Sequence, residues 1–339
     1  HIFKYQKISD KIDKYEFTNK DQKIFSNTYK WIVTEKIHGA NFAVYYNNGN
    51  ITFSKRNSIL NDSDWFYNYQ LIKDKLSTNI TKLSKIMNAT NIVIYGELFG
   101  GWYPSNVQEW NGAEKGICII PFEDRAIQEG IYYTPNIEYM VFDIAIIHND
   151  DDKQEFLDYY TMDNYLKQTT FFYSKPLMIG TFKDVENYNL KFDSLIPSQL
   201  GQELLPKNTN IAEGIVIKPI KPYFIKDNNN NNVRCLIKKK HSKFQEISDS
   251  FDLQEAKKSY QYIFSQLVNQ NRYQAVISKI GKLTNENINE VIDDVVEDTW
   301  KDFYQDYSNI NLNYDKAFAY SKQLCENLVH NNLLAFKKS

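Results

Sequence analysis

The hydrophobic pattern of this 339-residue chain changes its period near residue 245, and this change constrains the fold more than any other feature. Before that point, short apolar or alternating segments are separated by turn-forming residues, as in β-strands. After it, apolar residues recur at the spacing of amphipathic helices. A chain of this length suits two domains better than one. The sequence therefore predicts an α+β fold, with an antiparallel-sheet domain over residues 1–244 and a small all-α domain over residues 245–339.

The individual elements follow from the same periodicities. Residues 31–57 predict a hairpin, with strands at Trp31–Glu35, Phe42–Tyr46 and Ile51–Lys55. Further buried strands are predicted at Ile92–Tyr95, Tyr139–Ile147, Gly214–Ile217 and Val233–Ile237, with the asparagine run 228–232 as a surface turn. Helices are predicted at 65–88, 251–280, 285–307 and 314–336. Helix 285–307 has an apolar stripe, and its acidic opposite face is interpreted as solvated.

Composition narrows the classes of protein. Hydrophobic residues make up 42% and aromatic residues 15%, enough for packed cores and too much for a disordered chain. No run approaches the roughly 20 apolar residues of a membrane span, and no secretory leader is visible. The scattered Cys118, Cys235 and Cys325 predict a reducing, intracellular location, cytoplasmic or organellar. Residues 1–244 carry a net charge of +2 and residues 245–339 one of −4, so any nucleic-acid site would be a local basic patch.

One segment, Glu35–Phe42, places Lys36 between a predicted strand and Gly39. A lysine in this position can be aimed at a ligand, and Gly39 would let the backbone approach that ligand closely. Free lysine, with a pKa of about 10.4, is a poor nucleophile at neutral pH. It would need nearby cations or a metal ion that disfavour its proton. Taken alone, the spacing from Lys36 to Gly39 is also compatible with an ordinary exposed lysine.

Five further segments carry charged or aromatic residues at strand ends. They are Ser54–Asn57, Tyr95–Gly101, Phe142–Asp143, Glu213–Pro219 and Leu236–Lys240. In the last segment the alternation of a strand places Lys238 and Lys240 on one face and Lys239 on the other. Glu213 and Lys218 lie five residues apart and would face opposite sides of an ideal strand, so one ligand could meet both only if the strand twists.

This ordered set resembles the covalent nucleotidyltransferase superfamily of ATP-dependent ligases and capping enzymes. The closer resemblance is to the RNA ligase 2 family, which includes bacteriophage RNA ligase 2 and the trypanosome RNA-editing ligases. His38 stands where DNA ligases and capping enzymes usually have aspartate, and Asn41-Phe42 continue the branch pattern. The tail His241–Phe244 is similar to the family's, and helices follow where the other enzymes usually carry an OB-fold. Ala40 and His241 depart from the family's usual threonine and asparagine.

The resemblance implies an ATP-dependent RNA ligase. Lys36 would be the catalytic nucleophile, forming lysyl-AMP from ATP. AMP would then move to a 5′-phosphate RNA end, and a 3′-hydroxyl would displace it. The nucleotide-binding residues that the resemblance implies are Glu35, Ile37, His38, Asn41, Arg56, Glu97, Phe142, Asp143, Glu213, Lys218, Lys238 and Lys240.

Each of these residues has an expected role. Phe142 would stack on adenine, over a wall anchored by Asp143, while Glu35 and Ile37 would help read the base edge. Glu213 would help place Mg²⁺, or Mn²⁺, through water. Contacts with ribose or phosphate are expected for Asn41, Arg56 and Glu97. The residues expected beside the phosphates are His38, Lys218, Lys238 and Lys240.

The implied partner is RNA with 5′-phosphate and 3′-hydroxyl ends, in a nicked duplex, with no membrane. A protein partner could dock on the helical domain, from which a few basic residues, such as Lys257, Lys258 or Arg272, are expected to reach RNA phosphates. Two alternatives stay open. A DNA ligase or capping-type nucleotidyltransferase would be indicated by a preference for GTP or by an OB-fold after residue 245. A non-enzymatic nucleic-acid-binding assembly module would have a degenerate site.

Overall fold

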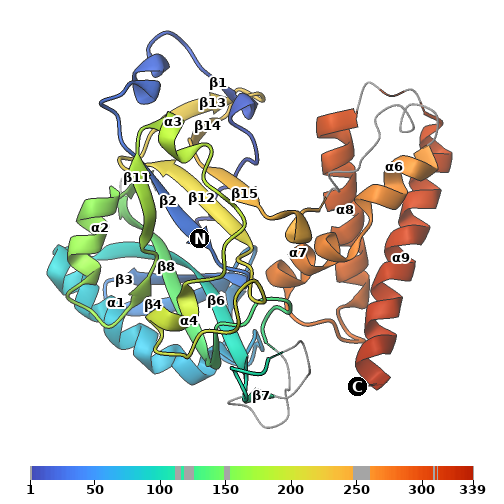
Figure 1. Ribbon diagram of the computed structural model, residues 1–339, viewed down its shortest axis with the longest axis horizontal. Helices are drawn as coiled ribbons and strands as arrows, with labels where there is room; N and C mark the ends of the chain where they lie inside the picture. Colours follow the sequence, from blue (N-terminus) through green and yellow to red (C-terminus); the bar gives the residue numbers. More distant parts are fainter. Residues whose placement is uncertain are drawn as a thin grey trace. The chain divides into compact units, whose positions relative to one another are not determined.

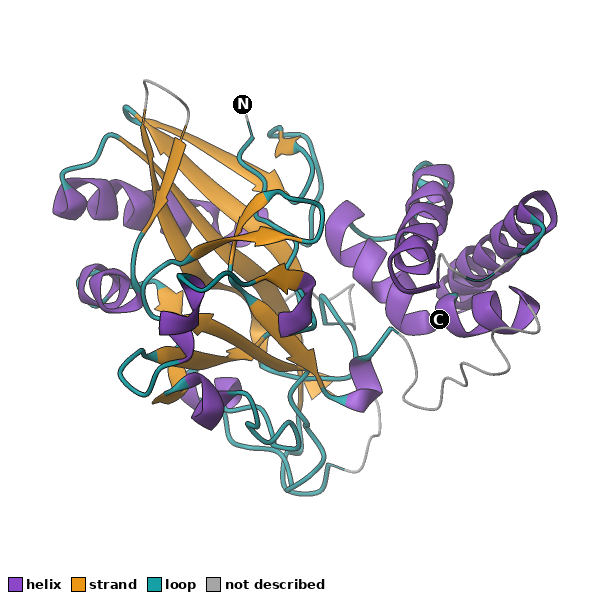
Figure 2. Ribbon diagram, turned by 90° about the horizontal axis from the view of Figure 1, so that it is seen from above, coloured by secondary structure: helices purple, strands orange, loops and turns teal. Residues whose placement is uncertain are grey.

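The computed structural model describes residues 2–110, 116–117, 126–148, 153–246, 260–307, 310 and 312–338. The chain divides into two compact units, residues 1–241 and 242–339. The first unit is built on β-sheets and the second on helices, as Figures 1 and 2 show. The predicted α+β class is therefore confirmed. Each unit has its own cluster of buried hydrophobic side chains.

The largest sheet of the first unit runs in the order β10-β8-β6-β3-β4-β5, with β7 on β6 and β9 on β8. Its strands are β3 (Ala40–Asn47), β4 (Asn50–Lys55), β5 (Ile59–Leu60), β6 (Asn91–Pro104), β7 (Gly116–Ile117), β8 (Thr134–His148), β9 (Lys153–Phe156) and β10 (Phe172–Tyr173). The pairs are antiparallel except that β10 runs parallel to β8. Helix α1 (Lys73–Met87) packs on β3 and β6 beside α2 (Tyr159–Leu166), as Figure 1 shows.

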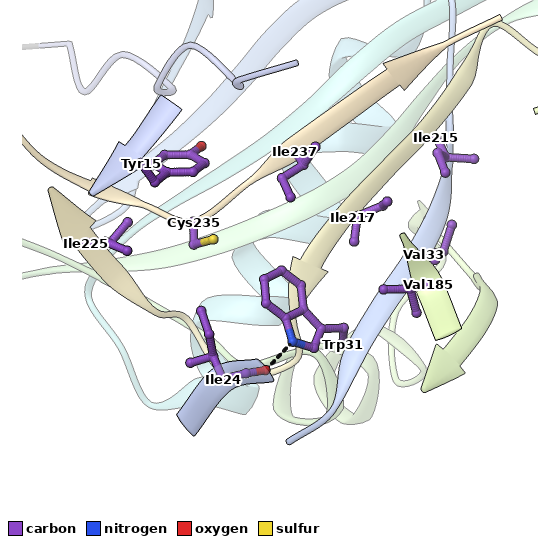
Figure 3. Packing of buried hydrophobic residues seen from close by; sticks show 10 residues of the cluster. All are labelled: Tyr15, Ile24, Trp31, Val33, Val185, Ile215, Ile217, Ile225, Cys235 and Ile237. Carbon is purple, nitrogen blue, oxygen red and sulfur yellow. Dashed lines mark hydrogen bonds between the residues drawn. The ribbon is translucent and has the colours of Figure 1, made fainter. Parts of the chain in front are cut away.

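A second sheet of the same unit has the order β11-β2-β12-β15. Its strands are β2 (Trp31–Lys36), β11 (Pro176–Gly180), β12 (Gly214–Pro219) and β15 (Ile237–Lys240). One face is apolar because alternate residues of a strand point the same way, and it carries Trp31, Ile215 and Ile237 (Figure 3). The Trp31 indole donates to the Ile24 carbonyl at 2.7 Å, which satisfies the only polar atom of that buried side chain. The opposite face of the sheet is therefore free to carry charged residues.

A small third sheet and several short helices complete the first unit. The third sheet, in the order β1-β13-β14, contains β1 (Tyr15–Glu16), β13 (Phe224–Asp227) and β14 (Asn232–Arg234). The short helices are η1 (Ile12–Lys14), η2 (Asp21–Phe25), η3 (Tyr69–Ile72), α3 (Phe182–Val185) and α4 (Ile196–Gln199). Cys235 and Cys325 are buried free thiols, and Cys118 lies outside the described residues.

Three predicted elements of this unit need correction. The segment 31–57 is not one hairpin, because β2 joins the second sheet while β3 and β4 pair in the first. The helix predicted from residue 65 begins later, since Tyr67 and Asn68 have positive φ angles of 47° and 56° that no helix continues through. The strand predicted at Val233–Ile237 is divided between β14 and β15, which belong to different sheets. The asparagine run is an exposed turn, as predicted.

The second unit consists, in its described part, of η4 (Ser242–Phe244), α6 (Tyr260–Leu267), α7 (Gln270–Ile280), α8 (Ile288–Tyr307) and α9 (Tyr314–Lys338). The helix predicted over 251–280 is interrupted at Asn269, whose side chain accepts the Arg272 backbone N–H at 3.0 Å and starts α7. Phe264, Trp300 and neighbouring apolar residues fill the core. Among the described helices, none is both long and apolar enough to cross a membrane.

One of the three basic residues named as candidates to reach RNA from this unit, Arg272, does not lie on its surface. Arg272 is fully buried, with its guanidinium donating to Asp298 and Asp302 at 2.8 Å each and to the Leu267 carbonyl at 2.6 Å. The sequence predicted these two carboxylates on a solvated acidic face, and they instead neutralise a buried cation. Arg272 therefore cannot bind a phosphate in this structure. The other two candidates, Lys257 and Lys258, lie outside the described residues.

Candidate active site

Lys36 is the last residue of β2, where three neighbouring strands end together. It pairs with Gly214 of β12, which in turn pairs with Lys240 of β15. Directly opposed residues of a sheet share a face, so Lys36 and Lys240 point to the same side. Gly214 has φ +156°, and a Cβ there would lie 2.0 Å from the Lys239 carbonyl oxygen. Only glycine fits, and the preceding Glu213 is thereby held close to both lysines.

Glu213 is the charge on which the lysines converge. Its Oε2 accepts a hydrogen bond from Lys36 Nζ at 2.8 Å, and its Oε1 lies 3.3 Å from Lys240 Nζ. Burial alone would raise the pKa of this carboxyl, but the Lys36 and Lys240 ammonium groups outweigh it and lower the pKa to about 2. Glu213 is therefore ionised at neutral pH and fixes both ammonium groups.

His38 lies beside this group as a neutral imidazole. Its Nδ1 is 3.8 Å from Glu213 Oε2. Burial lowers the pKa of His38 to about 4, and the nearby Lys36 and Lys240 act in the same direction against the opposing Glu213. The His38 backbone N–H donates to the Tyr133 hydroxyl at 2.9 Å. At pH 7 the ring can exchange hydrogen bonds with a ligand without adding a positive charge.

Gly39 permits a close approach between two segments of the first unit. A Cβ at this position would lie 2.3 Å from the Leu98 carbonyl oxygen on β6. The glycine therefore lets the turn after β2 cross closely over the other sheet, where β3 pairs with β6. The expected approach of its backbone to a ligand stays a prediction.

A second set of predicted residues lines the start of β3. Asn41 is directly opposite Glu97 in the β3–β6 ladder. Arg56 follows Lys55, which is the last β4 residue paired with β3. Burial raises the pKa of Glu97 to about 7, while the Lys36 and Arg56 charges act to lower it. Glu97 thus lies within electrostatic range of both cations, which joins this set to the Lys36 group.

Phe142 is placed by a β-bulge in β8. Tyr95 of β6 pairs with Asp143 and the next residue, Gly96, pairs with Val141, so Phe142 has no partner on β6. Bulges of this kind re-aim a side chain and are frequent next to active sites. The half-buried Phe142 ring packs edge-on against Tyr5, with ring centroids 5.0 Å apart.

The neighbouring Asp143 is the centre of a buried ionic network. It accepts hydrogen bonds from Lys218 Nζ at 2.7 Å, from Arg234 at 3.1 and 3.3 Å, and from the Tyr5 hydroxyl. Burial would raise the pKa of Asp143, but the Arg234 and Lys218 charges lower it to about 2. Lys218 also donates to the Phe142 carbonyl at 3.0 Å. Its ammonium is therefore engaged beneath Phe142, and its contact with a nucleotide phosphate stays a prediction.

Sequence reasoning missed Tyr5 and Arg234 as members of this network. Arginine is rare in this chain, with four residues, so Arg234 could have been singled out as a candidate on that weak ground. Tyr5 is one of 25 tyrosines, and nothing in the sequence distinguishes it from the others. Both reach Asp143 from segments far away in the sequence.

Glu35 and Ile37, on either side of the nucleophile, are both buried. Glu35 pairs with Ile215, and its side chain therefore lies on the apolar face, away from Lys36. Its carboxylate accepts hydrogen bonds from the Ser194 hydroxyl and from the Leu195 N–H at 3.0 Å. Burial raises the pKa of Glu35 to about 7. Any reading of a base edge by Glu35 would thus come from its backbone rather than from its carboxylate.

The alternation predicted for the last lysine segment is confirmed. Lys238 pairs with Val216 and Lys240 with Gly214, which puts both on the Lys36 face of the sheet. Lys239 points to the other face, where its ammonium donates to the Glu186 carbonyl. Across the described residues, no group of three or more His, Cys, Asp and Glu side chains could hold a metal ion by itself.

Comparison with known proteins settles the family. A family model for RNA ligase matches residues 29–240, which is more than half of the chain. The chain belongs to the RNA ligase family. A second model, for the C-terminal part of T4 RNA ligase 2, matches residues 251–327. Together these matches confirm the resemblance of this RNA ligase family member to the RNA ligase 2 branch.

Curated relatives of this RNA ligase family member include two proteins of Trypanosoma brucei brucei. Mitochondrial RNA-editing ligase 2 is 27% identical over 201 residues, covering 56% of this chain and 48% of the relative. Mitochondrial RNA-editing ligase 1 is 26% identical over 265 residues, covering 68% and 53%. The chain thus spans about half the length of the curated relatives it matches. A solved structure of a Naegleria gruberi RNA ligase mutant with ATP and Mn has a TM-score of 0.41 and 16% identity, covering 71% of this chain and 57% of that one.

Proposed function

We propose that the chain is an ATP-dependent RNA ligase that seals 3′-hydroxyl and 5′-phosphate RNA ends through AMP carried on Lys36. The observation that carries the proposal is the convergence of two lysines on one buried carboxylate, with Lys36 and Lys240 at 2.8 and 3.3 Å from Glu213. Membership of the RNA ligase family supports the reaction class. This arrangement brings a nucleophile and phosphate-neutralising cations to one place.

In the first step, the Lys36 amine attacks the α-phosphorus of ATP. A nitrogen–phosphorus bond forms, the bond from that phosphorus to the bridging oxygen breaks, and pyrophosphate leaves. Before this attack the Lys36 ammonium gives up one proton to solvent, because only the free amine is a nucleophile. Glu213 holds the ammonium in position until then. Lys238 and Lys240, on the same face, would offset the charge that develops on the phosphate oxygens.

The two later steps use the same positioned groups. An oxygen of the RNA 5′-phosphate attacks the AMP phosphorus, the bond to Lys36 breaks, and a phosphate–phosphate linkage forms. The RNA 3′-hydroxyl then attacks the 5′-phosphorus, loses its proton, and displaces AMP. Each step is an in-line displacement, for which positioning and charge neutralisation supply most of the catalysis.

The residues of this site could hold a divalent ion only if the ion keeps part of its hydration shell. Both oxygens of Glu213 are already engaged by ammonium groups. Mg²⁺ commonly keeps several waters and binds through one or two carboxylates together with substrate phosphates. Glu213 would therefore hold Mg²⁺, or Mn²⁺, through water. When bound, the ion would neutralise negative charge on the triphosphate.

Label transfer tests the proposal directly. The chain is incubated with radiolabelled ATP or GTP and Mg²⁺ and then separated under denaturing conditions. We expect one AMP per chain by intact mass, and none in Lys36→Ala. Lys36→Arg should also fail, because a guanidinium is effectively never deprotonated in a protein. Labelling by GTP would favour a capping-type enzyme, and the absence of any adduct would favour a non-enzymatic binding module.

The substrate form and the partner belong to the same proposal. On the resemblance to the RNA ligase 2 family, we take the substrate to be a nicked RNA duplex and expect it to be sealed faster than free single strands. A protein partner on the helical unit is supported by Tyr304, Tyr314 and Phe318, which remain exposed around Trp300. Efficient sealing by the purified chain alone would show that a protein partner is not required.

A further inference from the structure

Gln128 is a buried amide that no described residue satisfies. The side chain is only 2% exposed, and neither its Oε1 nor its Nε2 has a hydrogen-bond partner among the described residues. Buried polar side chains in folded proteins are nearly always hydrogen-bonded, because an orphaned donor or acceptor costs stability. A buried side chain with an unsatisfied donor and an unsatisfied acceptor is therefore expected to form hydrogen bonds with a bound ligand.

The backbone around Gln128 is fastened to the candidate active site on both sides. The N–H of Ile127 donates to the Gly100 carbonyl at 2.9 Å, three residues beyond Glu97 on β6. On the other side, the Glu129 backbone is hydrogen-bonded to the His38 ring. Gln128 thus sits in a short segment that bridges β6 and the turn following Lys36.

The two unsatisfied atoms, one donor and one acceptor, limit which chemical class of ligand can bind Gln128. A phosphate oxygen accepts hydrogen bonds only, so it would satisfy Nε2 and leave Oε1 without a donor. A ribose hydroxyl both donates and accepts, and two neighbouring hydroxyls can satisfy both ends of one amide. Glu97, which is expected to contact ribose or phosphate, lies on β6, the same strand to which the Ile127–Gly100 hydrogen bond attaches the Gln128 segment.

We propose that Gln128 is a specificity-determining residue that binds the hydroxyl groups of a ribose. The proposal rests on the ligase function argued above, which offers two such sugars. One is the ribose of ATP and the other is the terminal ribose at the RNA 3′ end. Both present the same hydroxyl chemistry, so the experiment has to separate them.

The perturbation is Gln128→Leu, which removes both orphaned atoms and nearly keeps the volume. Without a ligand, the variant should melt at the same temperature as the wild type or higher, because an unsatisfied amide is gone. Its preference for ribose should nevertheless fall. A purely structural Gln128, satisfied by buried water, predicts the opposite pair of results, namely a lower melting temperature and an unchanged preference.

Two assays identify the sugar. The first compares adenylylation rates with ATP and with 2′-deoxy-ATP. The second compares sealing of nicked strands whose 3′-hydroxyl nucleotide is a ribonucleotide or a 2′-deoxyribonucleotide. The wild type should prefer ribose in one assay, and Gln128→Leu should reduce that preference by roughly 2- to 12-fold, the equivalent of one neutral hydrogen bond. The assay in which the preference falls names the source of the ribose.

Asn79→Leu is the matched control. Asn79 is also a buried amide of the first unit, but its Nδ2 donates to Thr170 Oγ1 at 2.8 Å and its Oδ1 accepts the Thr170 N–H at 2.9 Å. Its replacement should lower the melting temperature and leave the ribose preference unchanged.

Unchanged preference in both assays, or a lower melting temperature for Gln128→Leu, would overturn the proposal. A wild-type chain that forms no adduct would instead contradict the ligase function. In that case, comparison of ATP and 2′-deoxy-ATP in equilibrium binding to wild type and Gln128→Leu still decides the role of Gln128.

Discussion

Glu213→Gln removes the one negative charge shared by Lys36 and Lys240 while keeping the side-chain shape. A fall in pKa from 4.5 to about 2 corresponds to about 3 kcal/mol of stabilisation of the charged form. Removing one partner of a buried ion pair typically costs about 3–5 kcal/mol. Because Lys36 and Lys240 keep 22% and 14% of their side-chain surface exposed, water offsets part of that cost. We therefore expect a loss of about 3 kcal/mol in the free energy of unfolding at pH 7, together with loss of adenylylation.

The destabilisation caused by Glu213→Gln is expected to depend on pH. The folded-state pKa of Glu213 lies below its unfolded value, so the charge stabilises the fold fully above pH 4.5. That contribution is lost as the pH falls from 4.5 towards 2, where the carboxyl becomes protonated in both states. Glutamine does not titrate. The difference in unfolding free energy between wild type and Glu213→Gln should therefore shrink through this window.

Urea denaturation with hydrogen exchange monitored on β12 measures the first unit alone, which matters because the chain has two units. Lys240→Met in the Glu213→Gln background is the control. It removes one unpaired cation, so the double variant should be destabilised by less than the sum of the single changes. An unchanged unfolding free energy at pH 7, or a deficit that persists at pH 2, would refute the reasoning.

Further predictions concern the lysine face, Glu97 and Arg272. Lys238→Ala and Lys240→Ala should both impair adenylylation in a label-transfer assay while Lys239→Ala is mild; equal losses would contradict the observed alternation. Glu97→Gln should raise the free energy of unfolding at pH 8 and leave it unchanged at pH 4. Burial lifts the Glu97 carboxyl pKa to about 7, so its ionisation at higher pH costs the wild type stability that the variant keeps. Urea denaturation at both pH values checks this, and a variant destabilised at pH 8 would refute it. Arg272→Met should destabilise the helical unit by about 3 kcal/mol or more, because Asp298 and Asp302 lose their buried partner. Protection of α8 from hydrogen exchange measures the loss. Unchanged protection would show that these two ion pairs are dispensable.

Properties that depend on neighbours along the chain can be predicted from the sequence. Strand alternation predicts that Lys238 and Lys240 share one face, and their pairings with Val216 and Gly214, respectively, confirm it. The change of period near residue 245 predicts sheets followed by helices, as the two units show. These features are local, because side-chain direction repeats every two residues in a strand and about every 3.6 in a helix. The Asn269 cap that divides the predicted helix 251–280 is local as well, but the apolar period continues across it and hides the break.

Pairings between distant segments were decided by the tertiary structure alone. Asp143 receives Tyr5 from 138 residues away and Arg234 from 91 residues away, and no periodicity records such partners. The same holds for β2, which leaves β3 for another sheet because Gly39 permits a close crossing over β6. Burial is also a property of the whole fold, since it depends on which segments cover a side chain. The sequence by itself therefore determined which residues could do the chemistry. The packing of distant strands decided that Lys36 meets Glu213 and that Gln128 is buried without a partner among the described residues.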